Sequence, residues 1–102
     1  IIAGGSNLTS PGSGATNVIE YITIASTGNA SDFGDLTFAV ELCTGTSSST
    51  RGIIAGGQVS STFKNDIQYI TIASTGNATD FGDLTVGIYQ CTPFSNGHGG
   101  LG

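Results

Sequence analysis

Basic side chains are scarce in this sequence of 102 residues. Arg51 and Lys64 stand against seven carboxylates, which gives a net charge of −5. Nucleic-acid binding depends on a basic surface, and binding to anionic lipid depends on a polybasic patch, so we expect neither partner. No apolar run approaches the roughly 18 residues of a membrane-spanning helix, so we also expect no membrane insertion.

Methionine and tryptophan are absent, and histidine and cysteine are rare. Without methionine, we expect a chain that was processed, excised or taken from a longer one. A structural zinc site takes four Cys or His ligands, whereas the sequence offers His98, Cys43 and Cys91. The two cysteines hold the same place in each copy of a repeat, which favours small buried apolar residues over a disulfide bridge.

Glycine is abundant, with 17 residues, and Ser and Thr fill much of the remainder. Such a composition, together with many β-branched side chains, favours turns and short strands. No window shows apolar residues at the i, i+3, i+4, i+7 spacing of an amphipathic helix. The sequence therefore predicts an all-β fold.

The sequence contains two nearly identical segments. YITIASTGNASDFGDLT at 21–37 returns at 69–85 with one change, from Ser31 to Thr79. IIAGG at the start of the chain returns at 53–57, and the loop that follows differs in length between the copies. A period near 50 residues with one variable loop indicates a repeat architecture.

We divide the chain into repeat 1 at 1–52 and repeat 2 at 53–102, which also holds the start of a third unit. Each repeat is expected to form four short strands separated by turn residues. The predicted strands are 1–4, 18–24, 33–37, 38–43, 53–56, 67–72, 81–85 and 86–91, and 44–50 is predicted to be loop. Gly76-Asn77 is predicted to turn with positive φ, and Gly82-Asp83 to bend.

Four strands in about 50 residues is the pattern of the kelch blade of a β-propeller. The sequence resembles kelch repeats in its double glycine Gly56-Gly57, in Tyr69 and in Phe81, which stands where kelch repeats usually carry Trp. Over 50–52, 69–85 and 95–101 it is more similar still to kelch-like arrays in proteins of marine phages and bacteria. The resemblance implies four-stranded antiparallel blades, as part of a β-propeller or of a β-repeat array or filament.

One departure from that pattern concerns an arginine a few residues after the Leu-Thr pair. Those places hold Ala39, Val40, Gly87 and Ile88, so a ligand role tied to that arginine is not carried over. A propeller closes with about 4–8 blades, and open strand edges pair with other chains. We therefore expect the partners to be other copies of the chain, in a ring or filament, or adjacent repeats of a longer chain.

The triplet Asp-Phe-Gly at 32–34 and 80–82 is also a metal-binding signature of protein kinases, but no other kinase motif accompanies it. We predict instead that the two phenylalanines pack between blades and that the glycines turn. The carboxylates beside them are weak calcium candidates, since calcium takes oxygen ligands, or else cap turns through backbone N–H groups. These residues are Asp32, Asp35, Asp80 and Asp83, with Asn29 and Asn77 adding carbonyl oxygens.

Three asparagines, Asn7, Asn29 and Asn77, match the N-glycosylation pattern, with unmodified turns as the alternative. The function that we expect is a non-enzymatic structural repeat of a virion or extracellular appendage, such as a phage tail or fibre. Carbohydrate is a further expected partner, through aromatics such as Tyr89 and Phe94. The alternatives are a secreted bacterial adhesin or surface filament, and a propeller enzyme, for which the sequence lacks a catalytic cluster.

Overall fold

The computed structural model of the chain describes residues 1–6 and 14–95. Its described residues form strands and no helix, which confirms the predicted all-β class. All paired strands run antiparallel. The strands are β1 (Ile2–Ala3), β2 (Thr16–Tyr21), β3 (Ser31–Val40), β4 (Thr44–Ser47), β5 (Arg51–Ala55), β6 (Gln58–Val59), β7 (Thr62–Phe63), β8 (Asp66–Thr71) and β9 (Thr79–Asp83).

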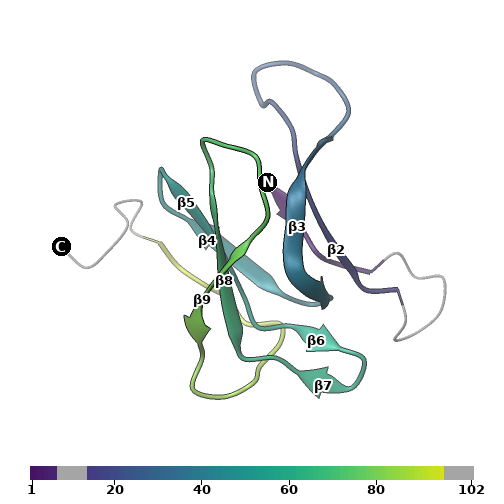
Figure 1. Cartoon of the computed structure of the whole chain (residues 1–102), viewed down its shortest axis with the longest axis vertical. Helices are drawn as coiled ribbons and strands as arrows, with labels where there is room; N and C mark the ends of the chain where they lie inside the picture. Colours follow the sequence, from purple (N-terminus) through teal and green to yellow (C-terminus); the bar gives the residue numbers. More distant parts are fainter. Residues whose placement is uncertain (7–13, 96–102) are drawn as a thin grey trace.

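Two sheets lie next to each other, and a small hairpin extends from them (Figure 1). The first sheet has the strand order β1-β2-β3, and the second sheet has the order β4-β5-β8-β9. The hairpin pairs β6 with β7 inside the variable loop of repeat 2. The second sheet therefore combines β4, which lies in repeat 1, with β5, β8 and β9, which lie at the boundary between the repeats or in repeat 2.

The two sheets share one register. In the first sheet Ile19 pairs with Gly34 and Tyr21 with Ser31. The residues 48 positions later pair in the same way, Ile67 with Gly82 and Tyr69 with Thr79. Both pairs of strands have a register shift at the same place, where an extra residue bends the strand. The repeated sequence therefore folds twice into the same three strands, and β4 is a fourth strand that only the second sheet has.

Several predicted strands are wrong in detail. The segments 33–37 and 38–43 were predicted as two strands, but β3 runs unbroken to Val40, because Thr37, Phe38 and Val40 favour a continued strand. The segment 86–91 forms no strand, and Thr44–Ser47, predicted to be loop, forms β4. Gly82 and Asp83 lie within β9, and Gly82 stands next to its register shift.

The left-handed backbone positions are not where the turn chemistry predicted them. Gly76 and Asn77 do not have positive φ, whereas the double glycines do, with φ of 67° and 105° at Gly56 and Gly57. Such angles favour glycine because it lacks a Cβ. A Cβ on Gly56 would also lie 2.7 Å from the carbonyl oxygen of Ile88. The double glycine therefore lets the chain turn tightly against a neighbouring backbone.

The core lies between the two sheets and draws on both repeats. Its buried side chains are those of Ile19, Phe33, Leu36, Val40, Ile54, Ile70 and Ala78. Burial of these apolar side chains is the main force that holds one sheet against the other. Within the described ranges no helix is long and apolar enough to cross a membrane.

Candidate functional site

The contact between the two sheets uses one face of each. Paired residues of antiparallel strands project from the same face. On the second sheet Gly52 pairs with Ile70 and Ile54 with Gln68, and these four residues are buried against the first sheet. This is the inner face of the second sheet. Its outer face carries the residues between them.

The inner face of the first sheet carries the aromatic pair of the repeat. Tyr21 contacts Phe33 edge to face, with ring centroids 6.1 Å apart. Tyr69 and Phe81, 48 positions later, make the same contact at 6.2 Å on the outer face of the second sheet. The same aromatic pair therefore faces the core in the first sheet and lies on the surface of the second.

The turn at 73–78, which connects β8 to β9, is hydrogen-bonded to the edge of β3. The backbone N–H groups of Gly76 and Ala78 donate to the carbonyl oxygens of Phe33 and Asp35, both at 2.8 Å. In return, the Asp35 N–H donates to the side-chain oxygen of Asn77 at 3.0 Å. The edge of β3 is thus covered by a turn and not by another strand.

A glycine is required in β3 at this contact. A Cβ built on Gly34 would overlap the carbonyl group of Gly76 and lie 3.0 Å from the backbone nitrogen of Asn77. A Cβ on Gly82, its counterpart, meets no described atom within 4 Å. The Asp-Phe-Gly triplet therefore makes a close approach between repeats in β3, and the prediction that Gly34 and Gly82 turn is wrong.

A buried glutamine adds a polar contact in the centre. The side chain of Gln68 is nearly inaccessible, and its Oε1 accepts a 2.7 Å hydrogen bond from the Thr37 N–H. A buried amide needs such a partner, because an unpaired polar group in the core is costly. Glu20 occupies the matching position of repeat 1 and is exposed.

Each half of this contact has an exposed duplicate. Phe33 is 5% exposed, but its counterpart Phe81 is 58% exposed. Ile70 is 2% exposed, but its counterpart Ile22 is 49% exposed. Phe33 packs in the core between the two sheets, whereas the prediction that Phe81 is packed in the same way is wrong for the isolated chain. The outer faces of the two sheets thus carry the two halves of a contact that the chain makes once internally.

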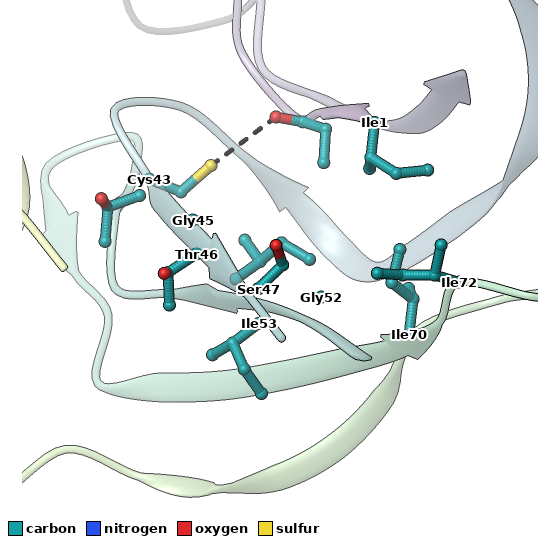
Figure 2. A pocket seen from close by; sticks show the side chains of 12 residues that line it. Ile1, Cys43, Gly45, Thr46, Ser47, Gly52, Ile53, Ile70 and Ile72 are labelled. Atoms are coloured by element: carbon teal, nitrogen blue, oxygen red, sulfur yellow. Dashed lines mark hydrogen bonds between the residues drawn. The ribbon is translucent and has the colours of Figure 1, made fainter. Parts of the chain in front are cut away.

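A cavity of about 530 Å³ opens between the sheets where the first sheet ends (Figure 2). Ile1 lies on one side of it, and Ile70 and Ile72 point toward it from the other (Figure 2). The second sheet continues past this point with β4, whereas the first sheet stops at β1. The cavity therefore lies where a fourth strand of the first sheet would cover the second.

The structure brings together two of the four calcium candidates. Oxygens of Asp80, Asp83 and Asp66 lie within 4.8 Å of one another, and Asp66 was not a candidate from the sequence. Only the pairing of β8 with β9 could have revealed it. The matching position of repeat 1 holds Val18, so Asp32 and Asp35 have no third carboxylate there.

This acidic cluster is a surface feature. Asp80 and Asp83 are exposed, and Asp66 lies 3.6 Å from the ammonium group of Lys64. Neighbouring carboxylates on a β-sheet surface repel one another and are offset by such a lysine. The cluster offers three carboxylates and no further carboxylate, His or Cys ligand among the described residues, where calcium takes six to eight oxygen ligands.

The glycosylation candidates differ in their surroundings. Asn29 and Asn77 are both exposed, but the side-chain oxygen of Asn77 accepts the hydrogen bond from Asp35 described above. Asn7 lies outside the described residues, as does His98. Asn77 therefore has a structural role in the contact between repeats, which its counterpart Asn29 does not have within the chain.

The two cysteines are free and half-buried, in agreement with the prediction of apolar residues. The thiol of Cys43 lies 3.8 Å from the carbonyl oxygen of Ala3 at the edge of β1 (Figure 2). Burial raises the pKa of the Cys43 thiol above its ordinary value of 9.0. A thiol held neutral in this way is a weak nucleophile, so its role here is packing.

Comparison with known proteins adds no relative. No family model matches the chain. A search of curated proteins also gives no match. The function is therefore inferred from the residues and from the contact that they make.

Proposed function

We propose that the chain is a non-enzymatic structural repeat module of a virion or extracellular appendage, such as a phage tail or fibre component. In this proposal the sheets are kelch-like blades of a propeller or of a longer β-repeat array. One observation carries it. Most residues of the contact between the sheets occur in both repeats, with Glu20 in place of Gln68 as an exception, and each outer face presents the unused half.

A module that repeats its own interface serves architecture. Repeat proteins bury their cores against neighbouring repeats, so near-identical repeats need one packing solution, used many times. The low charge and the Ser, Thr and Gly content suit a scaffold, and the sequence shows no motif that combines a nucleophile, a base and an orienting group. A secreted bacterial adhesin or surface filament built of the same units is the alternative.

An aromatic pair favours carbohydrate as a contact of this surface. Phe63 and Tyr89 stack with centroids 4.6 Å apart, and both rings are partly exposed. Exposed aromatic faces pack against the apolar faces of sugar rings, as apolar platforms with polar edges do in general. Binding to a glycan array, lost in Tyr89→Ala, is the expected result, and an array without signal contradicts this contact.

Immunogold electron microscopy tests the location. Antibodies against the purified chain are applied to virions and to intact and fractionated cells of the source. The proposal predicts label on an external appendage, at a regular spacing. Label confined to the interior of the cell would contradict both the virion and the surface reading. The same antibodies applied to material that lacks the protein serve as the control.

A further inference from the structure

We infer that two copies of this chain dock head to tail. The outer face of the first sheet of one copy packs on the outer face of the second sheet of the other copy. The inference deepens the proposed function, on which it rests. It follows from the two exposed half-contacts described above, which are continuous with an interface that the chain already makes. The matching positions of the two repeats identify the residues of this surface and a strand that one copy adds to the other.

The edge of β9 is the first part of the docking surface. Leu84 donates its N–H to the carbonyl oxygen of Asn65 at 2.6 Å. Since antiparallel pairs alternate, the N–H and C=O of Asp83 then point away from β8. The same groups of Asp35 bind the turn at 73–78. The β9 edge therefore matches the turn at 25–30 of a second copy, which has the identical sequence ASTGNA.

The side chains of the two outer faces are complementary in the same way. The second sheet offers Phe81, and the second copy offers Ile22, which follows β2. Their counterparts Phe33 and Ile70 both belong to the core between the sheets. Gly82 leaves room for the carbonyl group of Gly28, as Gly34 does for that of Gly76. Every residue type that the internal contact requires at these positions is present.

The segment 92–95 supplies a fourth strand next to β1 of the second copy. It follows Cys91 as β4 follows Cys43, and it lies outside the strands of the structure. By the register of β4, Thr92 would pair with Ala3 of the second copy and Phe94 with Ile1. Residues paired in this way project from one face. Phe94 would therefore point toward the cavity between the sheets of the second copy.

Phe94 fits this place because it is exposed and one part of the cavity wall is apolar, while Thr44, Thr46 and Ser47 line another part. Its side chain is 89% exposed in the chain. The cavity of about 530 Å³ has the side chains of Ile1, Ile54, Ile70 and Ile72 in its wall. Burial of an aromatic side chain among isoleucines is strongly favourable. In the second sheet the short Thr46 stands at this position, on the face away from the core.

The proline in this segment is compatible with the added strand. Pro93 corresponds to Gly45, which pairs with Ile54. Ser48 N–H donates to Arg51 at 2.9 Å, so the alternating ladder makes Gly45 and Ile54 a pair without hydrogen bonds between them. The N–H of Gly45 therefore points away from β5. A proline without this N–H loses no ladder bond there.

One position differs in charge between the contact within the chain and the contact between chains. The buried Gln68 is replaced by Glu20, whose carboxylate would accept the hydrogen bond from Thr85 that Gln68 accepts from Thr37. Burial of a carboxylate costs more than burial of an amide. The contact between chains is therefore weaker than the contact within one, and Glu20→Gln strengthens it.

A complementation experiment tests the docking. Sedimentation velocity is measured on the 102-residue chain over a range of concentrations, with a tail variant, Phe81→Ser/Phe94→Ser, and a head variant, Ile22→Ser. We expect self-association of the natural chain, at least about tenfold weaker in either variant. An equimolar mixture of the two variants forms a one-to-one complex, because each retains one intact half. Thr62→Ala, at an exposed position of the β6–β7 hairpin outside the surface, is the control and associates as the natural chain does.

Three results would overturn the inference. The natural chain stays monomeric at every concentration, the mixture of variants forms no complex, or the control loses association as fully as the variants. Glu20→Gln gives an independent test, with association at least about fivefold tighter; unchanged or weaker association contradicts the assignment. Circular dichroism of each variant establishes that it is folded. Failure here leaves the external location of the chain to be decided by the immunogold experiment.

Discussion

Two glycines in the same sequence context provide a sharp test of the contact between repeats. Gly34 and Gly82 both lie in Asp-Phe-Gly-Asp, with φ of 157° and 158°. The backbone cost of a Cβ is therefore equal at both and cancels between Gly34→Ala and Gly82→Ala. Only the surroundings differ, since the Cβ on Gly34 overlaps the carbonyl group of Gly76 and that on Gly82 meets no described atom.

The size of the difference follows from the bonds that must break. Relief of the overlap moves the turn at 73–78 off β3, which removes the hydrogen bonds from Gly76, Ala78 and Asp35. At about 1 kcal/mol for each of three bonds, Gly34→Ala should lose about 3 kcal/mol more stability than Gly82→Ala. Urea unfolding at low micromolar concentration, with monomers verified by sedimentation, measures both. Equal losses in the two variants would refute the close approach.

Further predictions use the same comparison of matching positions. Ile70→Ala should cost about 2–5 kcal/mol of unfolding free energy and Ile22→Ala less than about 1 kcal/mol in the monomer, and urea unfolding distinguishes them; similar costs would contradict the assigned burial. Asn77→Ala should lose about 1 kcal/mol and Asn29→Ala almost none, with the reverse order as the contrary result. Burial raises the pKa of the Cys43 thiol, so as the pH rises this thiol ionises in the unfolded chain before it ionises in the folded chain. The free energy of unfolding is therefore highest below about pH 9 and falls as the pH passes through the folded pKa. Cys43→Ala should flatten this alkaline loss, measured by unfolding at a series of pH values; an unchanged slope would count against it. Removal of calcium by a chelator should leave the melting temperature unchanged, and a fall would show that the acidic cluster holds an ion.

Much of the fold could be predicted from the repeat itself. The strands β5 and β8 lie within two residues of the segments predicted at 53–56 and 67–72, because apolar runs bounded by turn residues are local signals. The double glycines were also visible in the sequence, as a feature of the repeat. What they do, with positive φ against a neighbouring backbone, depends on contacts between distant segments.

The errors share a physical cause. Thr44–Ser47 has no apolar pattern, and it is a strand because the β5 edge offers it hydrogen-bond partners. The segment 86–91 has β-branched and aromatic residues, but its backbone hydrogen bonds go to the separate positions Lys64, Gly57 and Leu42 and build no strand ladder. Strand pairing is thus decided by the neighbour as much as by the sequence. The cluster around Asp66 was missed for the same reason, since it forms only across paired strands.

The central claim is that one contact is used within the chain and again between chains. Amide hydrogen exchange, resolved by residue, tests it most directly. The amides of Gly76 and Ala78 should be protected at every concentration, because they bind β3 within the chain. The amides of Gly28 and Ala30 should become protected only at concentrations at which the chain associates. If they exchange freely in the associated protein, the contact between chains is a different one.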